Sequence, residues 1–212
     1  MTPERWVFTE RYSKDVFGSE DEHLEGLMAR AVDAGLPPIA VSSDVGRLLK
    51  ILVSLTAGRR ALELGTLAGY SAIWIARGLD PGGILTTVEC EPKHADFARR
   101  EIAAAGESGH VDVVEGAALE VVPRLAEQWG PESVDFVFMD AAKTEYVEYF
   151  LLVKPLVKKG GLLVADNVYG TGAGWIDEGH GTDAFNRLIA GDDDFESVAL
   201  PLRQGVLMAR RR

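Results

Sequence analysis

Hydrophobic positions along the chain recur at two spacings, and their alternation predicts a protein built from strands and helices in turn. Residues 20–34 and 43–57 carry apolar positions at helical spacing, and the Pro37–Pro38 pair separates these two expected helices. Short apolar runs then alternate with helical stretches. The expected strands are 60–64, 84–89, 110–115, 134–139 and 161–165, and the expected helices between them are 70–78, 93–105, 117–128 and 144–158. This pattern is typical of a parallel sheet covered on both faces.

The end of the chain predicts a different connection between strands. Residues 195–200 and 205–209 are two strand-like runs, and only Pro201 to Gln204 separate them. So short a connection requires an antiparallel pair. We therefore predict an α/β fold, a Rossmann-like doubly wound sheet of seven strands, with five parallel strands and an antiparallel C-terminal hairpin. The glycine-rich stretch 169–182 beside it is expected to be a mobile lid.

Composition and charge narrow the class of protein. A chain of 212 residues with 47% apolar content can bury a single core, so we expect one domain over 1–212, with a helical part at 1–57 and the sheet core at 58–212. The formal net charge of -11 argues against binding to nucleic acid or to an anionic membrane. The single cysteine, Cys90, and the lack of a signal-peptide or membrane-spanning run favour a cytoplasmic protein.

A strand, a glycine turn and a helix within residues 61–71 predict a site for a nucleotide-sized ligand. Gly65 and Gly69 give G-x-x-x-G, not the G-x-G-x-x-G that lets a backbone approach a dinucleotide pyrophosphate. Glu63 would repel a pyrophosphate and attract a cationic ligand. A nucleoside that carries positive charge is therefore favoured, and S-adenosylmethionine (SAM) fits that description.

Glu89 ends the second expected strand, 24 positions after Gly65. In doubly wound folds an acidic residue at this point accepts hydrogen bonds from ribose hydroxyls, because its strand lies beside the first. A solvated strand end is the alternative for an isolated glutamate. Together with the glycine turn, the position favours ribose binding.

Three oxygen-bearing side chains follow the fourth and fifth expected strands: Asp140, Asp166 and Asn167. Because adjacent parallel strands end at the same edge, these side chains can converge. Two carboxylates and an amide carbonyl suit a hard divalent cation such as magnesium, which keeps positions open for water or substrate. Either aspartate taken alone could instead cap a helix or open a turn.

Lys143 lies three residues after Asp140, near the start of the next expected helix. The charged form of a lysine is disfavoured beside a bound cation, so its neutral amine could act as a general base. An ordinary exposed lysine is the alternative. Of the two tyrosines that follow, we expect Tyr146 to line the pocket and Tyr149 to lie in the core.

Taken together, these residues resemble the cation-dependent O-methyltransferases, the group that includes catechol O-methyltransferase and the plant caffeoyl-coenzyme A O-methyltransferases. The resemblance extends from Pro37 to Arg210. The motifs that carry it are, in order, Val41–Gly46, Glu63–Thr66, Gly69–Ser71, Glu89, Glu115–Leu119, Met139–Lys143, Asp166–Asn167 and Leu200–Leu202. Each motif is weak alone, and their joint occurrence in this order is specific.

The resemblance implies a SAM-dependent enzyme with a divalent cation, magnesium first among them. It implies that the SAM-binding residues are Val41, Glu63, Gly65, Thr66, Ser71, Glu89, Ala118 and Asp140. It further implies that Asp140, Asp166 and Asn167 hold the metal, that Lys143 and Asp140 are the catalytic residues, and that two copies form a homodimer. We hypothesise that a metal-chelated hydroxyl of a small, catechol-like phenolic acceptor receives the methyl group, with Lys143 as the base.

Two positions depart from the pattern of this family. Many relatives carry an aspartate where this chain has Ala142, and a Gly-Asp pair where it has Arg203–Gln204. Both changes remove negative charge near the expected acceptor site, so the identity of the acceptor stays open. Two other functions also stay open, namely a non-catalytic SAM-binding protein and a nicotinamide-dependent dehydrogenase. The missing G-x-G-x-x-G and the acidic Glu63 weigh against the dehydrogenase.

Overall fold

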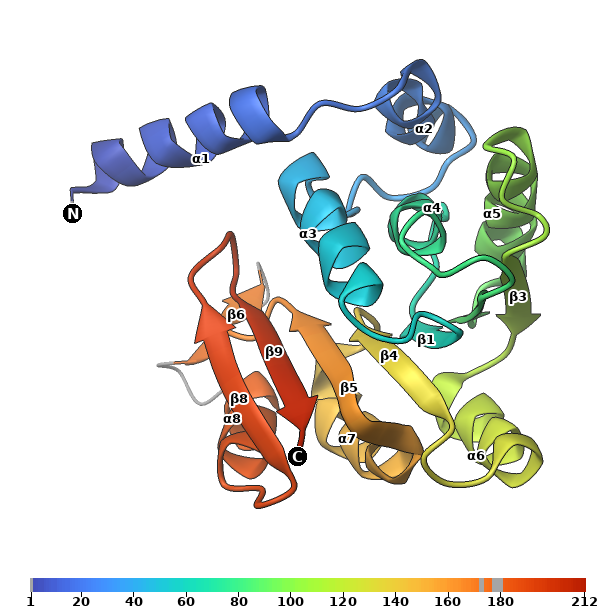
Figure 1. Ribbon diagram of the computed structural model, residues 1–212. Coiled ribbons are helices and arrows are strands. Elements are labelled where there is room, and N and C mark those ends of the chain that lie inside the picture. Colours follow the sequence, from blue (N-terminus) through green and yellow to red (C-terminus); the bar gives the residue numbers. More distant parts are fainter. Residues whose placement is uncertain (1, 172–173, 177–180) are drawn as a thin grey trace.

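A seven-stranded mixed sheet forms the centre of the computed structural model, which describes residues 2–171, 174–176 and 181–212 (Figure 1). Its strands lie in the order β3-β2-β1-β4-β5-β9-β8. Their bounds are Arg60–Leu64 (β1), Ile84–Glu89 (β2), Val111–Glu115 (β3), Val134–Met139 (β4), Val157–Asp166 (β5), Phe195–Leu200 (β8) and Val206–Arg211 (β9). Strands β1 to β5 pair in parallel, and β9 runs antiparallel to β5 and β8. The predicted fold class, with its antiparallel C-terminal hairpin, is confirmed.

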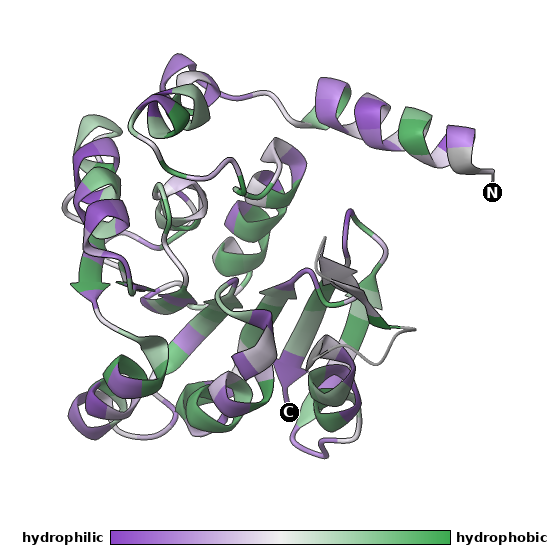
Figure 2. Cartoon of the chain, turned by 180° about the vertical axis from the view of Figure 1, so that it is seen from behind, coloured by the Kyte–Doolittle hydropathy of each residue, from purple (hydrophilic) through white to green (hydrophobic). Residues whose placement is uncertain are grey.

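Helices cover the sheet on both sides, and each side has its own hydrophobic core. One core contains residues of α2 (Glu22–Asp33), α3 (Ser43–Ser54), α4 (Tyr70–Ala76) and α5 (Pro92–Ala104), and the other contains residues of α6 (Ala118–Trp129), α7 (Tyr146–Val153) and α8 (Gly181–Ala190). Along β4, Phe136 and Phe138 belong to the first core, whereas Val137 and Met139 belong to the second. This alternation is the period-2 arrangement of a strand buried on both faces. Figure 2 shows the same distribution of hydropathy on the strands and on the inner faces of the helices.

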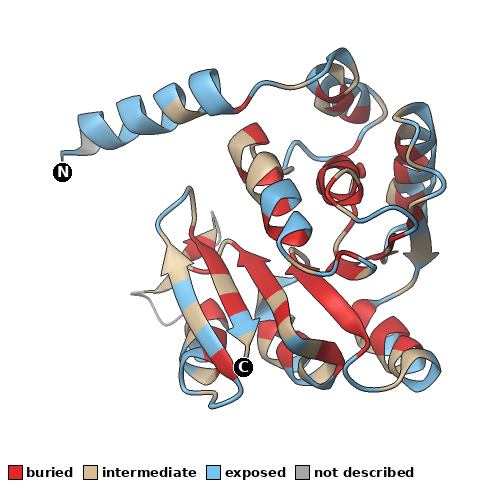
Figure 3. Cartoon of the chain, viewed as in Figure 1, coloured by how far each residue is buried: buried red, intermediate tan, exposed pale blue. Residues whose placement is uncertain are grey.

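Helix α1 (Pro3–Phe17) was not predicted from the hydrophobic pattern. It has ordinary helix-start signals, because the Thr2 side chain accepts a hydrogen bond from the Arg5 amide and a proline lies in the first turn. Its large apolar side chains are exposed, so they do not form the buried stripe on which the prediction relied. Figures 1 and 3 show α1 extending away from the sheet, with little of its surface covered.

The expected helix over 144–158 is shorter in the structure. A 3-10 turn at Lys143–Glu145 precedes α7, a second one at Lys154–Leu156 follows it, and β5 already begins at Val157. Pro155 accounts for the early end, because proline lacks the amide hydrogen that a continuing helix would use. Helix α8 was not predicted as an element either. It begins at Gly181, within the last two residues of the glycine-rich stretch 169–182.

The stretch where a lid was expected contains a small antiparallel pair, β6 (Gly170–Thr171) with β7 (Gly174–Trp175). Residues 172–173 and 177–180 of this stretch lie outside the described residues, so the lid stays a prediction. Within the part of the chain that is described, no helix has the length and apolar character needed to cross a membrane. The cytoplasmic location expected from the sequence also stays a prediction.

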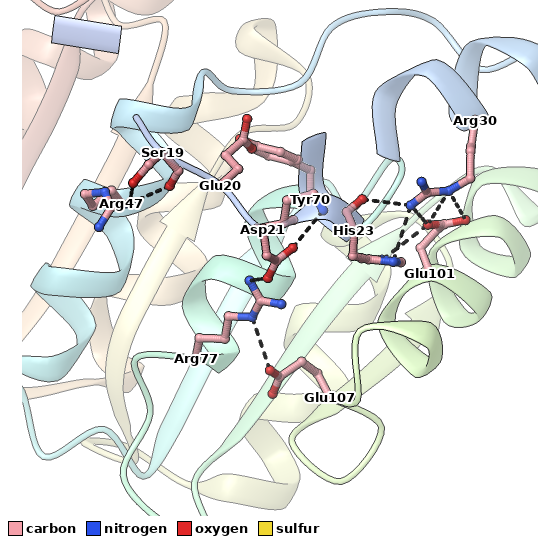
Figure 4. Close-up of polar contacts among 11 residues, drawn as sticks. Ser19, Glu20, Asp21, His23, Arg30, Arg47, Tyr70, Arg77, Glu101 and Glu107 are labelled. Carbon is pink, nitrogen blue, oxygen red and sulfur yellow. Dashed lines mark hydrogen bonds and ion pairs between the residues drawn. The ribbon is translucent and has the colours of Figure 1, made fainter. Parts of the chain in front are cut away.

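Polar contacts fasten the segment after α1 to the body of the protein (Figure 4). Three consecutive residues of this segment make such contacts. Arg47 of α3 donates to the carbonyl of Ser19 at 2.5 Å, and the Tyr70 hydroxyl of α4 donates to Glu20. Arg77 forms an ion pair with Asp21 at 2.7 Å. Because Tyr70 is itself buried, this segment is held against the same core that carries the sheet.

Asp135 is a buried carboxylate on β4 that joins three strands. It is 3% exposed, and it accepts hydrogen bonds from the amides of Arg59 and Arg60 at the start of β1, at 3.1 and 2.9 Å. Its other oxygen accepts from the Lys158 ammonium of β5 at 2.7 Å. The carboxylate therefore satisfies donors on both neighbouring strands.

Replacing this carboxylate should destabilise the sheet. Asp135→Ala is expected to lower the free energy of unfolding by about 2 to 4 kcal/mol, because two amides and an ammonium lose their acceptor. Urea denaturation followed by circular dichroism measures the change. The exposed Asp96→Ala, which removes a surface pair with Arg99, is the matched control and should cost about 0.5 kcal/mol or less. Equal losses in the two variants would contradict this account.

Candidate active site

A cavity of about 810 Å³ lies at the edge of the sheet where the parallel strands end. Residues that follow β1, β2, β3, β4 and β5 all contribute to its lining, together with residues 37–41 before α3 and the turn between β8 and β9. Strand order reverses between β1 and β4, which is where ligands bind in open α/β sheets. The volume is within the range of sites for small molecules and cofactors.

The glycine turn after β1 forms one wall of the cavity and requires glycine for steric reasons. Gly65 has a φ of 96°, and a Cβ atom there would lie 2.5 Å from the carbonyl oxygen of Asp140. Gly69, with a φ of 83°, caps the N-terminus of α4. Only glycine adopts these angles without strain. The turn thereby brings backbone, Thr66 and Ser71 to the cavity surface.

Glu89 lines the cavity at the end of β2 and also braces the glycine turn. One of its oxygens accepts hydrogen bonds from the amides of Thr66 and Leu67 at 3.2 and 2.7 Å, and the other accepts from the amide of Glu91 at 2.9 Å. A carboxylate has about four lone-pair sites, and the fourth is taken by the Cys90 thiol at 3.7 Å, a weak donor that a hydroxyl group in the cavity can displace. The two motifs that the sequence linked by spacing are therefore in direct contact.

Glu63 occupies a different environment from the one expected. Its side chain is fully buried and does not line the cavity. It lies opposite Thr87 of β2, whose hydroxyl donates to it at 2.6 Å, and burial raises its pKa to about 8 although the hydroxyls of Ser71 and Thr87 oppose that rise. The role of Glu63 in attracting a cationic ligand therefore stays a prediction, and a direct contact with a ligand in the cavity is not what its position favours. Its place is behind Ser71, which does line the cavity.

Asp140, Asp166 and Asn167 come together because β4 and β5 are parallel neighbours. Burial and the neighbouring Asp140 carboxylate raise the pKa of Asp166 to about 6, although the Arg203 guanidinium opposes the rise. Oxygen Oδ1 of Asp166 is buried without a hydrogen-bond partner. The Asn167 amide donates to Gln204 at 3.4 Å, which leaves its carbonyl oxygen to serve as a ligand. The donor set fits a hard divalent cation in its chemistry.

Two cationic side chains stand beside these carboxylates. Lys143 donates to Asp140 at 2.5 Å and to the Tyr146 hydroxyl at 2.8 Å. Arg203 lies 3.5 Å from Asp166, a contact that the sequence did not predict. Among the described residues no cluster of three His, Cys, Asp or Glu side chains has metal-site geometry, so a metal here would rest on two carboxylates and an amide.

Tyr149 belongs to the core as predicted, at 3% exposure, whereas the prediction that Tyr146 lines the cavity is wrong. Tyr146 is fully buried, and its hydroxyl lies 2.9 Å from the carbonyl oxygens of Met139 and Asp166. Tyr149 lines the cavity. The prediction assumed one continuous helix from residue 144, whereas the 3-10 turn at Lys143–Glu145 changes the direction of the side chains that follow.

Most residues predicted to hold SAM line this cavity. They are Val41, Gly65, Thr66, Ser71, Glu89, Ala118 and Asp140. The sequence assigned no site role to Cys90 or His94, which also line it. His94 lies 3.7 Å from Glu89, and its position on the first turn of α5, directly after β2, was the signal that could have placed it there.

The fold and the cavity define an α/β protein with a nucleoside-sized site next to a cluster of oxygen ligands. Residues 13–212 match the model of the O-methyltransferase family. A curated catechol O-methyltransferase of Niastella koreensis is 37% identical over 199 residues, which cover 91% of this chain and 89% of that protein. A catechol O-methyltransferase of Mycobacterium tuberculosis is 42% identical over 165 residues, which cover 78% of this chain and 73% of the relative.

Solved structures agree with these matches. The O-methyltransferase from Bacillus cereus, in complex with SAH, has a TM-score of 0.88 at 35% identity and covers 99% of both chains. TomG from Streptomyces achromogenes, involved in tomaymycin synthesis and in complex with SAM, has a TM-score of 0.87 at 34% identity, with 100% of this chain and 99% of TomG covered. The chain belongs to the O-methyltransferase family, as predicted. The comparisons support O-methyltransferase activity with SAM as the cofactor.

Burial of Glu63 should make stability depend on pH. Its folded-state pKa of about 8 exceeds its ordinary value, so the stability it contributes is full below about pH 4 and is lost as pH rises towards 8. Glu63→Gln mimics the protonated form, so the variant should gain stability over the wild type by up to about 1.4 kcal/mol per pH unit in that range. Urea unfolding of the ligand-free protein at several pH values measures this. The exposed Glu127→Gln controls for the substitution, and a pH-independent difference for Glu63→Gln would refute the expectation.

Proposed function

We propose that this O-methyltransferase transfers the methyl group of SAM to a hydroxyl of a small, catechol-like phenolic acceptor, with a divalent cation bound beside the cofactor. The observation that carries the proposal is one cavity lined both by the glycine turn after β1 and by Asp140 and Asn167, which follow β4 and β5, with the buried Asp166 directly before Asn167. The names of the two curated relatives support a catechol as the acceptor. Magnesium is the first candidate for the cation, because the ligands are hard oxygens.

The residues after β1 and β2 would hold the methyl donor. The backbone at Gly65 and Thr66 approaches the cavity without side-chain obstruction, and Ser71 adds a hydroxyl at the start of α4. Glu89 would accept a hydrogen bond from the ribose in place of the one from the Cys90 thiol. Val41 and Ala118 are small apolar contacts on the other walls.

Asp140, Asp166 and Asn167 would hold the cation, which supplies Lewis acidity that favours the deprotonated acceptor hydroxyl. Lys143 is the candidate base in its neutral amine form, which a bound cation would favour, since Asp140 and the Tyr146 hydroxyl hold its Nζ atom at the cavity wall. The acceptor oxygen forms a bond to the methyl carbon as the carbon–sulfur bond of the sulfonium breaks, and the hydroxyl proton passes to the Lys143 nitrogen. The sulfonium becomes a neutral thioether. Rate depends on holding donor and acceptor in line.

Removal of the cation tests this assignment. Chelation with EDTA should lower methyl transfer to catechol by about 100-fold or more, and added magnesium should restore it, because a Lewis acid supplies several kcal/mol to such a reaction. Asp166→Asn keeps the side-chain shape and should lose a similar factor in kcat/KM at saturating magnesium. Asp112→Asn, on the exposed side of β3, is the matched control. Unchanged turnover in excess chelator would rule out the cation.

Helix α1 supports the further proposal that two copies form a homodimer. It exposes six large hydrophobic side chains on a helix that extends from the body: Trp6, Val7, Phe8, Tyr12, Val16 and Phe17. Soluble proteins rarely leave so many large apolar side chains of one helix in water, and a symmetric pair is the commonest way to cover them.

Light scattering tests the assembly. The wild type at micromolar concentration should have twice the 23.0 kDa mass of one chain. Trp6→Glu with Phe8→Glu should shift the mass towards the monomer, because burying a charge at an apolar interface is costly. Thr9→Glu adds a charge to the same helix without removing an apolar side chain and should leave the dimer intact. A wild-type protein of monomeric mass would contradict the proposal.

A further inference from the structure

Arg203 is a cationic side chain at the cavity that the proposed reaction does not use. It lies in the turn between β8 and β9, lines the cavity, and has 21% of its side chain exposed. Its Nη1 atom is buried without a hydrogen-bond partner. A buried guanidinium nitrogen without an acceptor is costly, so this group calls for a partner.

Asp166 does not satisfy this need. The Arg203 and Asp166 atoms are 3.5 Å apart, whereas a charge-assisted pair usually closes to about 2.7–2.9 Å and is often bidentate. This loose contact joins Nη1 of Arg203 to Oδ2 of Asp166 and is not a hydrogen bond, so Nη1 has no hydrogen-bond partner among the described residues, and neither has the buried Oδ1 of Asp166. Lys143 differs, since Asp140 and the Tyr146 hydroxyl both accept from it. Lys143 and Arg203 are the Lys and Arg side chains that line the described cavity, and the Arg203 side chain makes no hydrogen bond to any of the described residues.

The backbone holds Arg203 in a conformation that favours glycine. Its φ is 50°, in the left-handed region where an L side chain is strained. The turn is nevertheless fixed, because the amides of Val168 and Tyr169 donate to the carbonyls of Gly205 and Gln204 at 3.1 and 2.8 Å. The guanidinium is thus presented from a rigid turn at a strained position, and its printed charged contact among the described residues is the loose pair with Asp166. This arrangement points to a ligand.

We propose that Arg203 selects acceptors that carry a carboxylate, so that the acceptor class is a dihydroxylated aromatic acid. The planar fork of a guanidinium matches a carboxylate, whose two oxygens can accept hydrogen bonds from two guanidinium N–H groups at once. The other charged walls of the cavity are mainly acidic, and they repel an anion placed elsewhere: Glu89, Glu91, Asp140 and Glu145. Arg203 therefore fixes where the carboxylate of the acceptor lies. This inference rests on the proposed function.

A matched pair of acceptors isolates the charge. Protocatechuate and its primary amide share the ring and both hydroxyls and differ in one negative charge. The wild type should prefer the acid in kcat/KM by about tenfold or more, the usual value of a charge-assisted pair. Arg203→Gln should bring the ratio close to one, and Arg203→Lys should keep part of the preference. Arg99→Gln, an exposed arginine of α5, is the control and should leave the ratio unchanged.

Binding without turnover separates this inference from the proposed function. Calorimetric titration of each compound into the protein with SAH and magnesium should show the acid binding about tenfold more tightly than the amide in the wild type, and equally in Arg203→Gln. Arg203→Gly, which also removes the strain, should give the same loss of preference if Arg203→Gln folds poorly. A wild type that binds and methylates both equally overturns the role of Arg203 and leaves the reaction standing. Tighter binding of the acid without any methyl transfer overturns the reaction instead.

Discussion

Parallel pairing of β1 with β2 and β4, and of β4 with β5, is the constraint on which the site depends. It brings residues that are distant in sequence to one edge of the sheet, where the strand order reverses. The backbones approach closely there. The amide of Asp140 donates a hydrogen bond to the carbonyl of Leu64 at 2.9 Å, and the carbonyl oxygen of Asp140 leaves no room for a side chain at Gly65. The glycine turn and Asp140 therefore share a backbone contact.

Negative charge concentrated at this edge is only partly compensated. Glu63 and Asp166 both have raised pKa values, of about 8 and about 6, with burial as the main cause and nearby carboxylates adding to it. Lys143 is fully engaged by Asp140, whereas Arg203 stands loosely beside Asp166. Such a site gains most from ligands that bring positive charge, such as a sulfonium and a divalent cation. A negative group on the acceptor is tolerated only where the loose cation lies.

The sequence predicted the sheet well because its strands are buried runs bounded by turn residues. It missed α1, whose apolar side chains face solvent, and overextended the helix that stops before Pro155. The site was predicted where residues follow strands directly, as at Asp140 and Asp166. Contacts that depend on local backbone geometry could not be predicted from the sequence. Glu63 lies behind the cavity wall, and Arg203 reaches Asp166 only because its turn adopts a left-handed conformation.

Tyr70 belongs to two parts of the molecule at once. Its ring lines the cavity, while its hydroxyl donates to Glu20 in the segment that leads from α1 (Figure 4). Residues 37–41, which precede α3, line the same cavity. Residues that precede the first strand thus form part of the cavity wall. The shortest piece of chain that would preserve the cavity is accordingly longer than the sheet with its crossover helices. Tyr70 also connects the segment after α1 to the cavity, so a change in that segment can alter the cavity wall.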